Sequence, residues 1–585
     1  MRTKIICTMG PSVFEVATLE KLIDAGMSVA RLNFSHGTHE EHLQVINRLK
    51  KVRESKNKPL ALMLDTKGPE IRVFELPVNP LPVEPHSMIE IVKEAHSARN
   101  PDAYIKIHPE VIVDHLKVGM KVLIDDGYIQ GTIVKKEKDK AVLEIFNPGK
   151  IKLKKSINIP DIDFHLPILY DEDKQDIAFG AKQDIDIIAL SFVTNAEQVL
   201  QVRKLLRDLG HPKILIVSKI ESANGDKNFD SILTVSDGIM VARGNLGVEL
   251  PIEKIPTLQK EFISKCLKIG KPVIVATQML ESMIQNPRPT RAEASDVAGA
   301  IFDAASAIML SGETAVGAYP IETVNTMRKI GFETERAFAY EEYFFKRANQ
   351  HYLNVPEAIA CATVHSTYMT QAKMIVVCTH SGETARQISK FRPQAKIVAI
   401  TPDSKTYHQL SLTWGVIPIL KNVHTMKEAI EIASEFALSN HICNIGDLIV
   451  VTSGALFGVS GSTNMLIFES IGQVVVRGEG NFLNQIVTGE VMKIVNLKKI
   501  QKEMIKDKII LLQDCSIDDF EVLKQAKGII LQNALEDLES IKVVKLLIDQ
   551  EIPSIIRADG AFDIIQSKEI VTIDSARGIV FKGEL

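Results

Sequence analysis

The stretch Ile214-Leu-Ile-Val-Ser-Lys-Ile-Glu221 joins an apolar, β-branched run to a lysine and a glutamate two positions apart. Residues of this kind favour strands, and side chains alternate between the two faces of a strand, so Lys219 and Glu221 point to the same side. A buried cation beside a carboxylate costs free energy unless ligands make use of both charges. The pair indicates either an ion pair at a strand end or a site for a metal ion and an anionic phosphoryl group.

The same arrangement recurs through the first half of the chain, where short apolar runs end in polar residues. The runs lie at Ile5–Cys7, Ser28–Leu32, Leu60–Leu64, Ile185–Leu190, Ile214–Ser218, Gly238–Val241, Pro272–Val275 and Ala307–Leu310. Helical patterns separate most of them, for example at 17–25, 39–53, 196–209 and 256–268. Strands that alternate with helices and end in polar residues predict an α/β fold, a (β/α)8 barrel. A doubly wound open sheet is the alternative, but it would not place polar residues at all eight strand ends.

Length and composition limit the possible classes of protein. A chain of 585 residues is too long for a single domain, and a content of 45% apolar and 24% charged residues is typical of globular proteins. A net charge of −4 gives no reason to expect nucleic acid or a membrane surface as partner. We expect no signal peptide or membrane-spanning segment, because no long apolar run occurs. The six cysteines are scattered without a C-x-x-C pair, which predicts reduced thiols in the cytoplasm.

The barrel pattern is interrupted once. We expect barrel parts at 1–70 and 166–344, with a small β domain at 71–165 between them. Its alternating segments lie at 88–92, 121–124, 129–134, 141–145 and 151–154. Because this domain leaves the face where the polar strand ends meet, it is a candidate lid that excludes water. Asp125-Asp-Gly127 is either a simple turn or a point of contact with a metal-bound nucleotide.

A strand-and-helix pattern resumes at 345–472. The strand 373–378 is followed by Thr379-His-Ser-Gly-Glu-Thr384 and a helix at 385–391, and the strand 447–452 is followed by the loop 458–464. Backbone N–H groups at a helix start, with hydroxyls and glycine, can bind an anion, although such residues also serve as simple caps. The candidates for a phosphorylated effector are Thr379, Ser381, Gly382, Thr384, Gly461 and Thr463.

The remaining segment, 473–585, is predicted to be a further domain. Its short strands are expected at 509–512, 528–531, 553–556, 569–573 and 578–582, with helical stretches between them.

Motifs in order along residues 1–472 resemble those of the pyruvate kinase family. They are Lys4-Ile-Ile-Cys-Thr-Met-Gly-Pro11, Arg31-Leu-Asn-Phe-Ser-His-Gly37, Asp65-Thr-Lys-Gly-Pro-Glu-Ile-Arg72, Ile124-Asp-Asp-Gly127, Ser236-Asp-Gly-Ile-Met-Val-Ala-Arg-Gly244, Ala276-Thr-Gln-Met-Leu-Glu-Ser-Met283, Pro287-Arg-Pro-Thr-Arg-Ala-Glu293 and Ser311-Gly-Glu-Thr-Ala315. The resemblance implies a barrel, a β lid and an effector-binding domain, assembled as a homotetramer. It also implies phosphoryl transfer from phosphoenolpyruvate to ADP, which gives pyruvate and ATP.

The resemblance implies a role for each site residue. Arg31 and Lys219 would bind the transferring phosphoryl group, Thr277 would help to protonate the enolate, and the N–H groups of Gly244 and Asn245 would bind the substrate carboxylate. Glu221 and Asn245 would hold Mg²⁺ or Mn²⁺. The oxygen ligands of K⁺ would come from Asn33, Ser35, Asp65 and Thr66, and the nucleotide contacts from Asn33, His36, Arg72 and Lys155.

Two residues and one segment are informative when the chain is compared with the family pattern. Glu70 stands where K⁺-dependent members carry Glu and K⁺-independent members carry Lys. Asn245 stands where the family motif has the Asp that is the second metal ligand. The segment 473–585 resembles the phosphohistidine domain of enzymes that use phosphoenolpyruvate, but Glu539-Ser540-Ile541 has Ile at the histidine position and no histidine follows His441. We therefore expect a structural or assembly role for this segment.

Two other functions fit parts of the pattern. A different barrel enzyme of phosphoenolpyruvate or 2-oxo acid chemistry would not need the lid, Arg72 or Lys155. A catalytically weak, effector-sensing binding protein would be compatible with Asn245.

Overall fold

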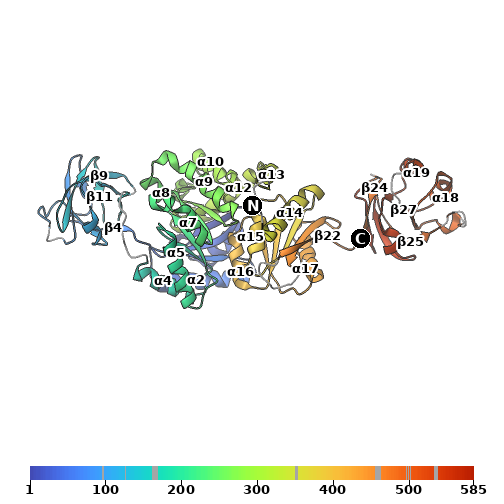
Figure 1. Cartoon of the computed structure of the whole chain (residues 1–585), viewed down its shortest axis with the longest axis horizontal. Coiled ribbons are helices and arrows are strands. Elements are labelled where there is room, and N and C mark those ends of the chain that lie inside the picture. Colours follow the sequence, from blue (N-terminus) through green and yellow to red (C-terminus); the bar gives the residue numbers. More distant parts are fainter. Residues whose placement is uncertain are drawn as a thin grey trace. The chain divides into compact units, whose positions relative to one another are not determined.

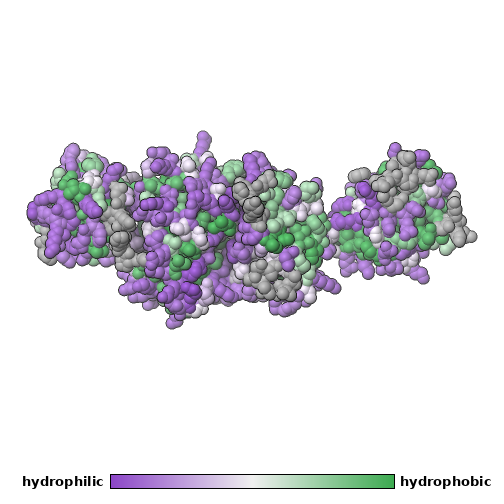
Figure 2. Space-filling view, in the orientation of Figure 1, coloured by the Kyte–Doolittle hydropathy of each residue, from purple (hydrophilic) through white to green (hydrophobic). Residues whose placement is uncertain are grey.

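The computed structural model describes residues 1–585 except 95–97, 126, 161–168, 349–353, 455–462, 482, 496, 498–499, 501, 533–537 and 585. Within those limits the chain forms two closed barrels and further sheets, and helices surround the first barrel and flank the later sheets (Figure 1). None of the helices within the described ranges is long and apolar enough to cross a membrane. The face shown in Figure 2 is mainly hydrophilic, with scattered apolar side chains.

Eight strands close the first barrel in the order β1-β17-β16-β15-β14-β13-β3-β2. They are β1 (Lys4–Thr8), β2 (Met27–Asn33), β3 (Ala61–Asp65), β13 (Ile187–Leu190), β14 (Leu215–Ile220), β15 (Gly238–Ala242), β16 (Val273–Ala276) and β17 (Ala307–Leu310). Neighbouring strands pair in parallel. The prediction of a (β/α)8 barrel is confirmed, and the open-sheet alternative is wrong.

Helices cover the outside of this barrel. They are α1 (Val16–Ala25), α2 (His39–Ser55), α4 (Asp171–Lys182), α5 (Ala196–Asp208), α6 (Ala223–Lys227), α7 (Phe229–Val235), α8 (Arg243–Glu249), α9 (Ile255–Lys268), α10 (Arg291–Phe302), α11 (Gly312–Ala315) and α12 (Pro320–Arg336). Capping boxes begin α2, α5 and α10, at Thr38, Asn195 and Thr290. Apolar side chains between helices and strands form one large buried cluster, and a second cluster fills the inside of the barrel.

The inserted segment is itself a closed barrel with the strand order β10-β6-β7-β4-β12-β8-β9. Its strands are β4 (Ile71–Glu75), β6 (Met88–Val92), β7 (Tyr104–His108), β8 (Lys121–Ile124), β9 (Ile129–Lys136), β10 (Lys140–Ile145) and β12 (Ser156–Asn158), beside the pair β5 (Leu81–Val83) and β11 (Gly149–Ile151). The predicted strand 151–154 is wrong: β11 ends at Ile151, and Leu153 and Lys154 form a turn in which Lys154 has φ +64. Asp125 and Gly127 lie in a turn, while Asp126 falls outside the described residues.

A five-stranded sheet follows. Its strands are β18 (Met374–Cys378), β19 (Lys396–Thr401), β20 (Val416–Leu420), β21 (Leu448–Gly454) and β22 (Thr463–Ser470). The helices of this region are α13 (Tyr340–Ala348), α14 (Val355–Thr370), α15 (Glu383–Ser389), α16 (Ser404–Gln409) and α17 (Met426–Ser439). The helix predicted at 385–391 therefore begins and ends two residues earlier.

The last segment forms an eight-stranded sheet of its own, in the order β23-β30-β29-β25-β26-β27-β28-β24. The strands are β23 (Val474–Arg477), β24 (Glu479–Gly480), β25 (Ile486–Ile494), β26 (Ile509–Leu512), β27 (Gly528–Leu531), β28 (Ser554–Ile556), β29 (Ile570–Asp574) and β30 (Ile579–Lys582). Helices α18 (Phe520–Leu523), α19 (Leu538–Asp549) and α20 (Ala561–Ile564) accompany them. Two apolar clusters, both made only of residues from this segment, form its core.

Candidate active site

Lys219 lies at the centre of a polar network on three neighbouring strands. Its Nζ donates to Asp65 Oδ1 at 3.0 Å and to Ser191 Oγ at 2.8 Å, and it lies 3.3 Å from Glu221 Oε1. The side chain of Lys219 is 11% exposed, and that of Glu221 is 2% exposed. Burial alone would lower the pKa of Lys219, but Asp65 and Glu221 outweigh it and raise the pKa above its ordinary value. Lys219 is therefore held charged at the carboxyl end of β14.

Arg31 is the second cation of this network. Its Nε donates to Asp65 Oδ2 at 2.6 Å, and its Nη1 donates to Thr8 Oγ1 at 2.9 Å. Burial of Asp65 acts to raise the pKa of its carboxyl, but Arg31 and Lys219 together hold that pKa below its ordinary value. One carboxylate thus orients two cations. We refer to Arg31, Asp65, Ser191, Lys219 and Glu221 as the Lys219 cluster.

Glu221 and Asn245 contact each other directly. Glu221 Oε2 accepts the N–H of Phe192 at 2.7 Å, and Glu221 Oε1 accepts Nδ2 of Asn245 at 3.0 Å. Within the described residues, no group of three or more His, Cys, Asp or Glu side chains is placed to hold a metal ion. One carboxylate and one amide oxygen still fit Mg²⁺, which commonly takes its remaining ligands from water and substrate oxygens. The Asn245 amide must rotate to present its oxygen.

Thr277 lies at the end of β16 in a strained turn, because it and Gln278 have φ of +72 and +54. Its Oγ1 donates to Ala276 O at 2.6 Å and accepts the N–H of Gly244 at 2.8 Å. Arg243 Nη2 donates to Thr277 O at 2.7 Å. The N–H of Gly244, which the resemblance assigns to a substrate carboxylate, therefore has a partner within the protein.

The predicted K⁺ ligands lie together because β2 and β3 pair in register, with Asn33 opposite Asp65. Asn33 Oδ1 accepts the N–H of Ser35 at 3.2 Å, and Thr66 Oγ1 accepts the N–H of Ser191 at 3.0 Å. Asp65 and Thr66 are each 1% exposed. The four residues supply only oxygen ligands, which suits a hard cation.

A cleft of about 160 Å³ opens at the carboxyl end of the barrel beside these groups. The predicted site residues that line it are Arg31, Asn33, Ser35, His36, Arg72, Lys219, Glu221, Asn245 and Thr277. Lys155 and Gly244 are not among its lining residues, and Asp65 and Thr66 are buried beside it. The structure thus brings most of the predicted site residues to one place.

Comparison with known proteins agrees with this geometry. Residues 1–324 match the family model of the pyruvate kinase barrel domain, and residues 357–467 match that of the pyruvate kinase alpha/beta domain. The chain belongs to the pyruvate kinase family. It is 41% identical to a pyruvate kinase of Bacillus licheniformis and 39% identical to one of Staphylococcus epidermidis, in each case over 100% of this chain and 99% of the relative. A crystal structure of a pyruvate kinase from Cryptosporidium parvum superimposes with a TM-score of 0.76 at 38% identity, covering 80% of this chain and 96% of that one.

In this member of the pyruvate kinase family, the basic lid residues predicted to meet a nucleotide are paired with acids. Arg72 Nε donates to Glu70 Oε2 at 2.6 Å, and Lys155 Nζ lies 2.7 Å from Asp125 Oδ1. Arg72 and Ser156 are opposite each other on β4 and β12, which brings Arg72 and Lys155 to one part of the lid. His36 is exposed at the rim of the cleft.

The predicted effector residues are partly brought together. Thr384 Oγ1 and Thr463 Oγ1 lie 2.7 Å apart, while Thr379 Oγ1 accepts the N–H of Gly382 at 3.0 Å. The carbonyl of Ser381 accepts Nη2 of Arg386 at 3.1 Å. Gly461 lies outside the described residues.

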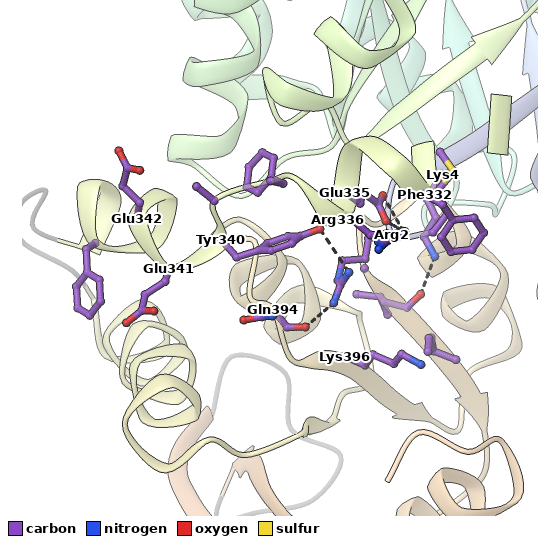
Figure 3. Close-up of a pocket in the computed structure, with 17 residues that line it drawn as sticks. Arg2, Lys4, Phe332, Glu335, Arg336, Tyr340, Glu341, Glu342, Gln394 and Lys396 are labelled. Carbon is purple, nitrogen blue, oxygen red and sulfur yellow. Dashed lines mark hydrogen bonds between the residues drawn. The ribbon is translucent and has the colours of Figure 1, made fainter. Parts of the chain in front are cut away.

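A larger cavity of about 1070 Å³ lies away from the Lys219 cluster (Figure 3). Arg2 donates to the hydroxyl of Tyr340 and the carbonyl of Gln394, and Lys4 Nζ donates to Val416 O at 2.7 Å. The carboxylate of Glu335 accepts the N–H groups of Arg2 and Thr3. Arg2, Lys4 and Glu335 therefore already have partners within the protein. The larger volume of this cavity is not enough to identify it as the reactive site.

Sequence reasoning assigned no role to Ser191 and Arg243. Ser191 Oγ donates to Thr66 O at 2.6 Å and accepts from Lys219, so it joins the end of β3 to the lysine on β14. Arg243 forms a two-point ion pair with Asp296, at 2.6 and 2.7 Å, while holding the turn at Thr277. The signal for Ser191 was its place at the end of a strand; the partner of Arg243 lies 53 residues away, where no local pattern points to it.

Proposed function

We propose that this protein transfers the phosphoryl group of phosphoenolpyruvate to ADP, giving pyruvate and ATP, with Mg²⁺ or Mn²⁺ and K⁺. The observation that carries the proposal is the Lys219 cluster: two fixed cations beside Glu221 in a cleft at the carboxyl end of a barrel. Fixed charges of this kind stabilise a transferring phosphoryl group without reorganising during the reaction.

Each residue then has a defined task. A β-phosphate oxygen of ADP attacks phosphorus, the bond from phosphorus to the enol oxygen breaks, and the enolate takes a proton at C3 to give pyruvate. Arg31 and Lys219 bind phosphoryl oxygens, and Lys219 also neutralises the charge that develops on the enol oxygen. Thr277 routes the proton to C3, and the lid excludes water. Glu221 and Asn245 would hold the divalent ion, which would supply positive charge for the substrate oxygens.

We propose further that the loop 379–384 takes a phosphorylated effector, and that the enzyme works as a homotetramer in the cytoplasm. The closeness of Thr384 and Thr463 supports an effector site to which Thr463 contributes beside the loop 379–384.

A coupled assay that follows ATP and pyruvate together tests the proposal. We expect equal amounts of both from phosphoenolpyruvate and ADP, dependent on Mg²⁺ and K⁺. Formation of pyruvate without ATP would instead favour a different barrel enzyme of 2-oxo acid chemistry, and turnover of neither substrate would favour a binding protein.

Glu70→Lys is expected to restore part of the activity in the absence of K⁺. Glu70 lines the cleft near the predicted K⁺ ligands, and an ammonium group there can supply the positive charge that the ion provides. Activity is measured in tetramethylammonium buffer with and without K⁺. Glu84→Lys, the same charge change at an exposed lid position, serves as control and should stay K⁺-dependent. Full activity of the unaltered enzyme without K⁺ would refute the expectation.

Asn245→Asp is expected to lower the half-saturating Mg²⁺ concentration about tenfold, which corresponds to roughly 1.4 kcal/mol. The substitution adds a negative charge and replaces the amide donor to Glu221 Oε1 by a repulsive carboxylate, which a bound cation relieves. The requirement is measured at fixed phosphoenolpyruvate. Asn286→Asp adds the same charge at an exposed loop position outside the cleft and should change nothing. An unchanged or higher requirement in Asn245→Asp would show that Asn245 is not a metal ligand.

Deletion of residues 473–585 is expected to lower stability or weaken assembly while leaving the chemical step intact. The segment has its own apolar clusters, and it bonds to the preceding domain through Arg577 Nη1, which donates to Ile445 O at 2.7 Å, and Arg477 Nη2, which donates to Gly446 O at 2.8 Å. Turnover, the unfolding temperature and molar mass in solution are measured for the shortened chain. Transfer of radioactive phosphate from phosphoenolpyruvate to residues 473–585 of the full chain would contradict a purely structural role.

A further inference from the structure

The amino end of the barrel is closed by residues 404–412, which comprise α16 and the turn Leu410–Leu412. We call them the plug segment. Leu412 is 1% exposed and belongs to the same apolar cluster as the residues inside the barrel. That cluster also contains Met240, Ala276 and Met309, which line the cleft at the opposite end. A continuous column of packed side chains therefore runs from Leu412 to the floor of the cleft.

The plug segment also anchors three strands by polar contacts. Gln409 Nε2 donates to Asp186 O at 3.1 Å, just before β13, and to Lys213 O at 2.7 Å, just before β14. His408 Nδ1 accepts the N–H of Leu60 at 3.3 Å, just before β3. Lys405 Nζ donates to Ile185 O at 2.6 Å. The anchored strands are neighbours in the barrel.

The same three strands carry most of the Lys219 cluster at their other ends. Asp65 ends β3, Ser191 follows β13, and Lys219 lies near the end of β14. Their contacts of 2.8 and 3.0 Å require a particular stagger of the strands. Because a strand is stiff along its length, an anchor that stops sliding at the amino end also sets the position of the side chains at the carboxyl end.

The plug segment touches the candidate effector loop as well. Thr406 Oγ1 donates to His380 O at 2.9 Å, and Thr406 is 5% exposed. A Cβ atom built on Gly382 would lie 3.1 Å from Leu410 Cδ2 and 3.4 Å from Thr406 Cγ2. The loop 379–384 therefore rests on α16 and on the residue that follows it.

We propose that the plug segment positions the Lys219 cluster from the opposite end of the barrel, with Gln409 as the positioning residue and Thr406 as the link to the loop 379–384. The reaction that it serves rests on the proposed function; the mechanical link does not. Because coupling between two sites is reciprocal, binding of a ligand in the cleft must also change the stability of the loop 379–384.

Gln409→Leu tests the positioning role. It removes two hydrogen bonds to strand ends, and we expect kcat to fall about tenfold or more with little change in the KM for ADP. Amide hydrogen exchange should accelerate at 187–192 and 215–221. Gln259→Leu is the matched control: both glutamines are 6% exposed, but Gln259 donates to Asp303 rather than to a strand end. Equal effects in the two variants, or no effect in Gln409→Leu, would overturn the proposal.

Thr406→Val tests the link while leaving the shape of the side chain nearly unchanged. Binding of phosphoenolpyruvate with Mg²⁺ should slow amide exchange in the loop 379–384 of the unaltered enzyme and have little effect in Thr406→Val, whose basal turnover stays the same. The same response in both proteins, or none in the unaltered enzyme, would overturn the link.

Trp414 gives a second readout on the intact chain. It is the single tryptophan, it is 4% exposed, and the guanidinium of Arg392 lies 4.7 Å from its ring centre. Saturating phosphoenolpyruvate should shift its emission, and Leu412→Ala should reduce the shift. If calorimetry shows that phosphoenolpyruvate binds but the emission of Trp414 does not shift, the inference is contradicted. Absence of phosphoenolpyruvate binding would instead count against the proposed function, and the exchange comparison between Gln409→Leu and Gln259→Leu would still decide the positioning role.

Discussion

Lys219→Met is expected to lower kcat by about a thousandfold, because it removes a charge aimed at the transition state. Methionine keeps the length of the side chain, but it offers no charge to the phosphoryl group or to the enol oxygen. It also leaves Asp65 Oδ1 and Ser191 Oγ without their shared donor. Steady-state turnover of phosphoenolpyruvate and ADP gives the rate, and calorimetry with phosphoenolpyruvate shows whether binding survives.

Lys213→Met is the matched control for this result. Lys213 lies just before the same strand, and its Nζ pairs with Asp403 at 2.6 Å, at the end of β14 opposite to the cleft. Its removal takes away one ion pair of a mostly exposed lysine and keeps the Lys213 carbonyl that accepts from Gln409, so turnover should stay near that of the unaltered enzyme. A loss of less than tenfold in Lys219→Met, or a similar loss in Lys213→Met, would mean that Lys219 only supports the fold.

Most of the barrel could be predicted from the sequence, because its strands are buried on both faces and appear as short apolar runs. The polar residue after each run then indicated the reactive face without any knowledge of long-range contacts. Lys219 and Glu221 illustrate this: alternation along one strand is enough to place both on the same side. Partners on the same or a neighbouring strand are the part of a site that local pattern can reveal.

Contacts between distant segments could not be predicted in this way. Arg243 and Asp296 are 53 residues apart on α8 and α10, yet Arg243 Nη1 donates to Asp296 Oδ1 at 2.6 Å. The donation from Asn245 to Glu221 depends on the orientation of an amide, which the residue type leaves open. The lid strands β4, β5, β7 and β12 were missed. Lys154 adopts a left-handed turn where an alternating pattern suggested a strand.

Asp65→Asn is expected to lower the free energy of unfolding of the barrel by about 3–5 kcal/mol, because it leaves Arg31 and Lys219 buried without their shared counter-charge. Unfolding by guanidinium chloride, followed through Trp414 emission over a range of pH, measures the loss. Asp173→Asn is the matched control: Asp173 is 3% exposed and accepts the N–H of Gly68, but burial raises its pKa and, among the residues that the structure describes, no cation pairs with it directly. The substitution of Asp173 should lower the free energy of unfolding much less.

The pH dependence of that difference follows from the directions of the pKa shifts. The pKa of Asp65 is lowered in the folded protein, so its contribution is present above the unfolded value of about 3.9 and is lost as pH falls through the folded value. The pKa of Lys219 is raised, so its contribution is present below the unfolded value of about 10.4 and is lost as pH rises through the folded value. The difference in the free energy of unfolding between the unaltered enzyme and Asp65→Asn should therefore be largest between about pH 5 and pH 9 and should become smaller in acid. Asp173 has a raised pKa, and its carboxyl therefore favours the folded state more as pH falls. If Asp65→Asn lowers the free energy of unfolding only slightly at neutral pH, or lowers it more in acid, the charge of Asp65 does not hold the two cations in place.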